Sequence, residues 1–197
     1  MARAQGKFVV MALLLGGMPG IGSAFMWPQA QPIDVEHSSF TIHVGKAGLF
    51  SPFGHDHTVR APIASGEVDR GKAQVALAVK SASLVVADPG ESESTRAEVQ
   101  KTMLGPEVLD VQRYPEIRFQ STRVEKRDGN SWQVTGELEL HGARRPITFT
   151  VKESGGAFTG SAIVKQRDFG ITPVTAGGGT VKVKNEVMVE FEVKLSK

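Results

Sequence analysis

The sequence predicts an all-β domain, an eight-stranded antiparallel barrel with one short helix inserted near residues 92–104. Two patterns predict this fold. Apolar residues recur at every second position in eight segments, and successive side chains of a strand point to opposite faces. Turn sequences rich in glycine separate several segments, among them Asp128-Gly129-Asn130 and Ser154-Gly155-Gly156. Short turns of this kind join antiparallel neighbours.

The first 24 residues are typical of a secretory signal peptide. Arg3 and Lys7 precede an apolar run at 8–15, and Gly22-Ser23-Ala24 resembles a signal peptidase site. The run is much shorter than the roughly 20 residues that a spanning helix needs. We therefore expect export and cleavage near Ala24, which gives a periplasmic or secreted protein. Residues 25–32 would then be a short leader, and residues 33–197 the barrel domain.

Composition and charge narrow the classes of partner. The chain has no cysteine, so disulfides and thiolate chemistry are excluded. Removal of the signal takes Arg3 and Lys7 away and leaves 21 basic and 21 acidic residues. This balance lacks the basic excess typical of nucleic-acid binding. After the signal, no apolar run is long enough to span a bilayer.

The alternating segments define the expected strands. The clearest is 181–195, in which apolar residues share one parity, charges dominate the other, and only Asn185 breaks the apolar set. Segment 57–69 is expected to bend near Pro62 and Gly66. The remaining segments are 40–44, 74–80, 117–120, 132–140, 147–152 and 158–165. Because the charged parity must face solvent, the apolar parity faces inward, where an eight-stranded barrel is filled or holds one small ligand.

Two glycines interrupt the inward-facing rows. Gly136 and Gly160 occupy positions where the alternation calls for an apolar side chain. Glycine inside a strand often marks either a bend of the barrel or a place where a ligand comes close. The sequence leaves both alternatives open.

The helix has a start and a stop signal. Ser92 or Ser94 can cap its amino end, and Gly105-Pro106 ends it. We expect this helix to lie over the edge or mouth of the barrel.

Motifs spread over residues 33–195 resemble the YceI-like family. The opening motifs are Ile33-Asp34-Val35-Glu36-His37-Ser38, Phe40-Thr41-Ile42-His43-Val44 and Gly48-Leu49-Phe50. The later ones are Leu109-Asp110-Val111, Tyr114-Pro115-Glu116-Ile117-Arg118-Phe119, Gly136-Glu137-Leu138-Glu139-Leu140-His141-Gly142 and Arg167-Asp168-Phe169-Gly170-Ile171. The resemblance implies a periplasmic, lipocalin-like barrel of eight strands that binds a polyisoprenoid chain in an elongated cavity. It also leaves a homodimer open.

The expected function is therefore binding. We expect an exported protein that holds a long apolar ligand, an isoprenoid or other lipid, for transport, storage or sequestration, without a cofactor. The expected cavity lining is Phe40, Ile42, Phe50, Phe53, Leu77, Val79, Ile117, Phe119, Trp132, Val134, Leu138, Phe149, Val187, Val189 and Phe191. His55, His57 and Arg60 are candidates for contact with a polar head group. A barrel filled by its own side chains is the structural alternative.

Four histidines keep a metal site open as a second hypothesis. His37, His43, His55 and His57 lie within 21 residues, and His55 and His57 share one face of a strand. Imidazole is a common ligand of zinc, copper and nickel, which would suit a metal-binding protein or a metal-dependent enzyme. The spacing matches no strong metal motif, and no Gly-x-Ser-x-Gly nucleophile elbow is present. We therefore expect a binding protein rather than an enzyme.

Overall fold

The computed structural model describes residues 30–47, 56–176 and 181–196. Its strands are β1 (Gln31–Pro32), β2 (Ser39–Ala47), β3 (His57–Arg60), β4 (Ser65–Asp69), β5 (Gln74–Lys80), β6 (Val85–Val86), β7 (Glu116–Lys126), β8 (Ser131–Leu140), β9 (Ala143–Ser154), β10 (Ala157–Lys165), β11 (Thr175–Ala176) and β12 (Val181–Lys194). Its helices are α1 (Glu93–Leu104) and the short 3-10 helices η2 (Ser81–Ser83) and η3 (Gln166–Phe169).

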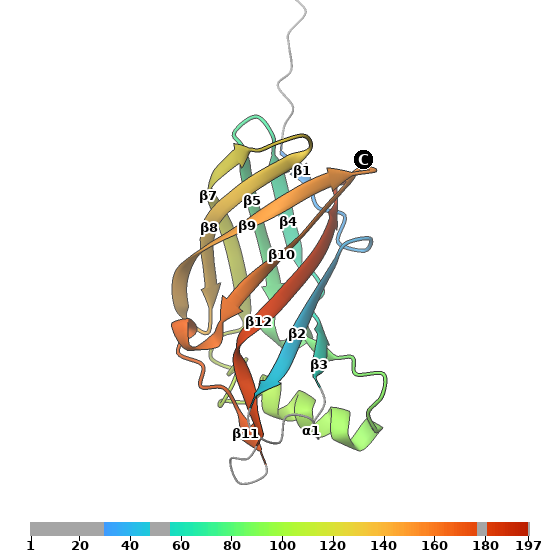
Figure 1. Ribbon diagram of the computed structural model, residues 1–197, viewed down its shortest axis with the longest axis vertical. Coiled ribbons are helices and arrows are strands. Elements are labelled where there is room, and N and C mark those ends of the chain that lie inside the picture. The colour runs from blue at the N-terminus through green and yellow to red at the C-terminus, as the bar shows by residue number, and fades with distance from the viewer. Residues whose placement is uncertain (1–29, 48–55, 177–180, 197) are drawn as a thin grey trace, which may run out of the picture.

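The strands form one strongly curled antiparallel sheet (Figure 1). Eleven of them follow the order β1-β4-β5-β7-β8-β9-β10-β12-β2-β3-β6, and β11 pairs with β12 beside this path. The predicted number of eight strands is wrong. The predicted segment 57–69 is divided into β3 and β4, and β1, β6 and β11 have two residues each, too few to show alternation.

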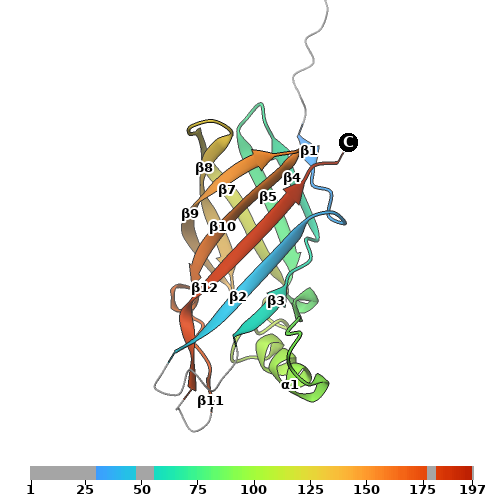
Figure 2. The ribbon, with the colours of Figure 1, turned by 45° about the vertical axis from the view of Figure 1, so that its right-hand side comes forward.

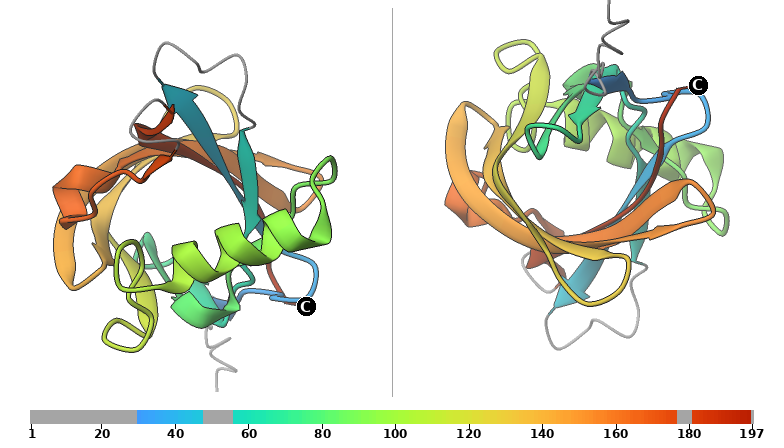
Figure 3. Two further views of the ribbon diagram at one scale, coloured as in Figure 1. Left: turned by 90° about the horizontal axis from the view of Figure 1, so that it is seen from below. Right: turned by 90° about the horizontal axis from the view of Figure 1, so that it is seen from above.

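Backbone hydrogen bonds connect strands near the two edges of the sheet and so stabilise its curled shape. The Ala61 N–H donates to the Phe40 carbonyl at 3.0 Å, and the Ala64 N–H donates to the Ala78 carbonyl at 2.8 Å. One continuous segment thus pairs with β2 at its start and with β5 at its end. At the other margin, Ile33 bridges to Leu195. Seen end-on, the strands therefore surround an interior (Figure 3).

The curled sheet has two different ends. We call one the hairpin end, because the turns at 70–73, 127–130 and 155–156 gather there (Figures 1 and 2). The other is the helix end, which carries α1, the segment 105–114, the turn at 141–142 and η3. The strands run obliquely between these ends, as Figure 2 shows for β10, β12 and β2.

Helix α1 confirms the predicted helix. The Ser92 side chain accepts the Thr95 N–H at 3.1 Å, so Ser92 is the cap, and the helix ends at Gly105. Gln100 ties α1 to the sheet, because its Oε1 accepts the Val86 N–H and its Nε2 donates to the Leu84 carbonyl, both at 2.7 Å. Seen from below, α1 crosses the helix end (Figure 3). No helix in the described ranges has the length and apolar character to cross a bilayer.

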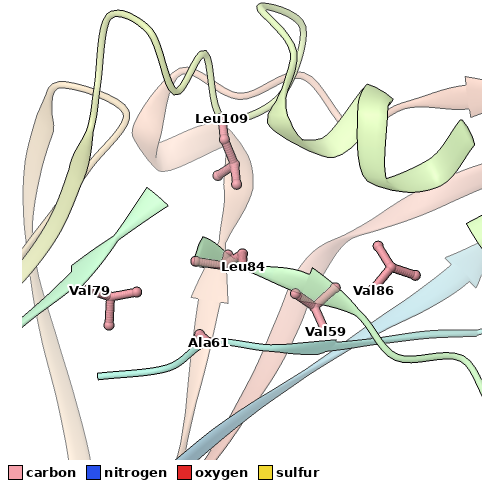
Figure 4. Close-up of a cluster of buried hydrophobic side chains, with 6 residues drawn as sticks. All are labelled: Val59, Ala61, Val79, Leu84, Val86 and Leu109. Carbon is pink, nitrogen blue, oxygen red and sulfur yellow. The ribbon is translucent and has the colours of Figure 1, made fainter. Parts of the chain in front are cut away.

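Buried side chains fill the helix end. One cluster consists of Val59, Ala61, Val79, Leu84, Val86 and Leu109 (Figure 4). The α1 side chains that pack against it are Val99, Met103 and Leu104. A second cluster, Val164, Phe169 and Ile171, lies around η3. Burial of this apolar surface stabilises the fold.

Gly136 and Gly160 have a role that the sequence did not reveal. A Cβ atom on Gly136 would lie 2.5 Å from Cζ of Phe119, and one on Gly160 would lie 2.6 Å from Cζ of Phe191. Each glycine therefore lets a phenyl ring of the neighbouring strand lie against the wall. The expected strand is interrupted between β3 and β4, over residues that include Pro62, whereas Gly66 lies inside β4.

Candidate ligand-binding cavity

A cavity of about 600 Å³ occupies the interior of the curled sheet. This volume lies within the usual range for small-molecule sites, roughly 300–1,000 Å³. Among the described residues, the polar or charged ones in its lining are Asp69, Arg70, Gln74, Lys126 and Gln166. All other lining residues are apolar, so the cavity suits a ligand that is mostly hydrocarbon.

Strand alternation builds this lining. The inward parities of β2, β5, β7, β8, β9, β10 and β12 all contribute apolar side chains to the cavity. On β8, lining residues extend from Trp132 to Leu140, which corresponds to roughly 26 Å at about 3.3 Å per residue. The wall is therefore long enough for an extended chain.

Four phenyl rings from different strands run in sequence around the wall. The ring centroids are 5.4 Å apart for Phe119 and Phe149, 5.5 Å for Phe149 and Phe191, and 5.6 Å for Phe191 and Phe40. These distances are typical of favourable aromatic pairs. Because Gly136 and Gly160 have no Cβ, the rings of Phe119 and Phe191 can lie against the neighbouring strands. The four rings, which we call the phenyl belt, therefore line the cavity without filling it.

The structure places most of the predicted lining residues in this wall. They are Phe40, Ile42, Leu77, Val79, Ile117, Phe119, Trp132, Val134, Leu138, Phe149, Val187, Val189 and Phe191. Phe50 and Phe53 lie outside the described residues. Contact between these side chains and a ligand stays a prediction.

The two described head-group candidates, His57 and Arg60, are not in the cavity lining. His55 lies outside the described residues. His57 lies near the helix end, where its Nδ1 is 2.6 Å from Oδ2 of Asp88. Arg60 is exposed on β3, and neither His57 nor Arg60 lines the cavity.

The described histidines of the metal hypothesis do not converge. His43 lies opposite Thr58 in the register, so it faces the other side of the sheet from His57. Nε2 of His43 is 3.1 Å from Glu190, and Nδ1 of His37 is 2.9 Å from Asp34. Burial acts to raise the pKa of Asp34, but hydrogen bonds from His37 outweigh it and lower that pKa. Among the described residues, no three His, Cys, Asp or Glu side chains gather as a metal site.

Lys126 is a cavity residue that sequence reasoning missed. A bulge between Ser121 and Arg123 shifts the register of β7 against β8. Ile117 and Phe119 line the cavity before the bulge, whereas Val124 and Lys126 line it afterwards. A bulge inserts one residue and so reverses which parity faces inward. The only sequence signal is Val124, an apolar residue on the otherwise polar parity.

The hairpin end carries most of the charge in the cavity lining. Asp69 accepts the Lys72 N–H at 2.9 Å, and this backbone bond is the main cause that lowers the pKa of Asp69. Nη2 of Arg70 donates to Glu153 at 2.9 Å, and its guanidinium lies 5.1 Å from the centroid of the Phe158 ring.

Comparison with known families decides where this fold belongs. The model of the YceI-like domain matches residues 32–195, nearly the whole described barrel. The chain belongs to the YceI-like family. The resemblance noted in the sequence is therefore confirmed.

Curated relatives match this YceI-like chain over part of its length. A UPF0312 protein of Pseudomonas putida (strain W619) is 34% identical over 88 residues, which cover 40% of this chain and 46% of the relative. A UPF0312 protein of Yersinia pestis (strain Pestoides F) is 31% identical over 98 residues, or 45% of this chain and 50% of the relative. The chain thus aligns with about half the length of these relatives.

Solved structures share the fold of this YceI-like chain. Burkholderia cenocepacia BcnA superposes with a TM-score of 0.58 at 20% identity, over 84% of this chain and 99% of that one. The YceI protein of Campylobacter jejuni gives a TM-score of 0.51 at 16% identity, over 77% and 84% of the two chains. At these identities the likeness concerns the fold alone.

Proposed function

We propose that this protein is an exported binding protein that holds a long apolar ligand, an isoprenoid or other lipid, inside its curled sheet. Its task would be transport, storage or sequestration of that ligand. The observation that carries this proposal is the cavity of about 600 Å³ with its almost entirely apolar lining. A barrel filled by its own side chains would have no such space.

Burial of hydrocarbon supplies the binding free energy in this proposal. Each methylene group moved out of water contributes about 0.8 kcal/mol. A chain with ten buried methylenes would gain about 8 kcal/mol before the entropic cost of association. No catalytic group is needed for binding of this kind.

Export belongs to the same proposal. The amino-terminal pattern Arg3 and Lys7, the apolar run at 8–15 and the small residues before Phe25 support secretion to the periplasm. Fractionation of expressing cells, with amino-terminal sequencing of the product, tests it. The expected product starts at Phe25, and a cytoplasmic chain that retains Met1 would contradict export.

Native mass spectrometry tests the binding proposal. The purified protein is measured before and after organic extraction, and then again after incubation with polyprenyl lipids. We expect a co-purified or added lipid at one molecule per chain. A protein that carries no lipid and takes up none of those offered would contradict the proposal.

Two neighbouring substitutions on β10 provide a matched control. Ala162 lines the cavity, whereas Ile163 is 56% exposed on the outer face. Ala162→Phe adds a ring to the interior and should reduce lipid uptake strongly. Ile163→Phe adds a ring outside and should leave uptake unchanged. Equal uptake by both variants would show that the lipid binds elsewhere.

A further inference from the structure

Lys126 brings a positive charge to the rim of the cavity at the hairpin end. The residue lines the cavity and is also exposed to solvent. The bulge in β7 places it there, directly opposite Trp132 on β8. Within the described ranges, no carboxylate forms an ion pair with Lys126.

The other two charges of the cavity lining already have partners. Asp69 pairs with Lys72, whose Nζ lies 3.3 Å from Oδ2. Arg70 pairs with Glu153 at 2.9 Å. Each of these ion pairs has no net charge. Among the described cavity-lining residues, Lys126 is therefore the charged one without an ion-pair partner.

Among the described residues, the cavity lining at the helix end carries no charged side chain. The polar lining residue there is Gln166, which is 9% exposed and donates from Nε2 to the Lys184 carbonyl at 2.8 Å. Buried apolar clusters and α1 lie at this end. Of the described lining residues, those at the hairpin end therefore offer a ligand's polar end its charged partner.

We propose that the cavity takes an anionic single-chain amphiphile, whose carboxylate or phosphate lies at Lys126 and whose hydrocarbon chain runs toward the helix end. This inference rests on the proposed lipid-binding function and specifies the class and orientation of the ligand. An ammonium group pairs readily with either anion, because hydrogen bonds between charged groups are stronger than those between neutral ones.

Trp132 supplies a probe of that orientation. It lines the cavity opposite Lys126, and Trp27 is the only other tryptophan of the chain. In a Trp27→Phe background, fluorescence comes from Trp132 alone. Bromine on a bound chain quenches this fluorescence when it lies close to the indole ring.

Affinity measurements test the charge preference. The ligands are palmitate, hexadecyl phosphate and hexadecanol, which share one chain length and differ in their heads. We expect Lys126→Gln to weaken binding of the preferred anion about fivefold, a change typical of a partly exposed ion pair, with hexadecanol unaffected. Lys126→Arg should retain the affinity. Lys152→Gln removes an exposed, non-lining lysine on β9 near the same end and should change nothing.

Brominated palmitate tests the orientation. Bromine near the carboxyl end should quench Trp132 strongly, and bromine near the methyl end only weakly. Reversed or equal quenching would overturn the inference, as would equal loss of hexadecanol and anion affinity in Lys126→Gln. If the wild type binds all three ligands equally, the anionic class is wrong but lipid binding stands. If it binds none of the three but takes up polyprenyl lipids, this inference is wrong and the proposed function stands; if it takes up neither, the proposed function itself fails.

Discussion

The helix end and the hairpin end of the curled sheet differ in how deeply their apolar side chains are buried. At the helix end, Leu84 and Leu109 are 3% and 8% exposed, and α1 packs over them. At the hairpin end, Val124 is half-buried and Lys126 and Arg70 reach solvent while lining the cavity. The same alternation of side chains produces both ends, so the difference lies in what covers them.

Because of this difference, we expect the helix end to contribute mainly to the stability of the fold and the hairpin end mainly to ligand binding. Close packing at the helix end buries apolar surface without need of a ligand. The cavity lining extends from Leu84 and Leu109 to Val124 and Lys126. Val124 and Lys126 are less buried, so a bound guest would add most to their contacts. Substitutions at the two ends should therefore affect different properties.

The largest expected effect is a loss of stability at the helix end. Leu84→Ala removes a buried side chain from the cluster in Figure 4 and should lower the free energy of unfolding by about 3 kcal/mol. Val124→Ala at the hairpin end should cost under about 1 kcal/mol, because its methyl groups are only half-buried. Urea unfolding followed by circular dichroism measures both. Equal losses would remove the distinction between the ends.

A glycine of the wall should show the next largest effect. Gly136→Ala places a Cβ within 2.5 Å of the Phe119 ring and of the Gln120 carbonyl oxygen. The forced shift should destabilise the fold by about 2 kcal/mol. Gly90→Ala is the control, since nothing lies within 4 Å of its added Cβ. A neutral Gly136→Ala would mean that the ring does not need the space.

The attachment of α1 depends on Gln100. Gln100→Leu removes both bonds to the backbone of β6 and its neighbour Leu84 and should cost roughly 1–2 kcal/mol. Hydrogen exchange of the Val86 amide should accelerate. Glu98→Leu, at an exposed position of the same helix, should leave this exchange rate unchanged. Slow exchange in Gln100→Leu would show that other contacts hold the helix in place.

The smallest expected effect concerns Asp69 and pH. Its folded-state pKa lies below the usual 3.8, so its contribution to stability is present above that value and is lost as the pH falls through the lowered pKa. Asp69→Asn should therefore lower Tm slightly at neutral pH, with a gap from the wild type that narrows below about pH 3.8. Asp128→Asn, in another turn at this end, serves as the control. A gap independent of pH would contradict this role.

The sequence predicted the framework of the fold because alternation over long segments reports directly which face is buried. It predicted α1 from its cap and stop residues and most of the cavity wall from parity. The two-residue strands β1, β6 and β11 are set by tertiary contacts and leave no periodic signal.

Local interruptions of the pattern explain what sequence reasoning missed. The bulge after Ser121 moved Lys126 inward, against simple parity. Gly136 and Gly160 leave room for the rings of Phe119 and Phe191, and residue alternation along one strand does not show this contact with the next strand. Arg60, a head-group candidate from the sequence, is not among the residues that line the cavity.

A crystal structure of the protein loaded with brominated palmitate tests the central claim most directly. We expect an anomalous bromine peak inside the curled sheet, among the cavity-lining side chains that include the four phenyl rings. A peak on the outer surface, or an interior occupied by rearranged side chains with no bromine, would contradict it.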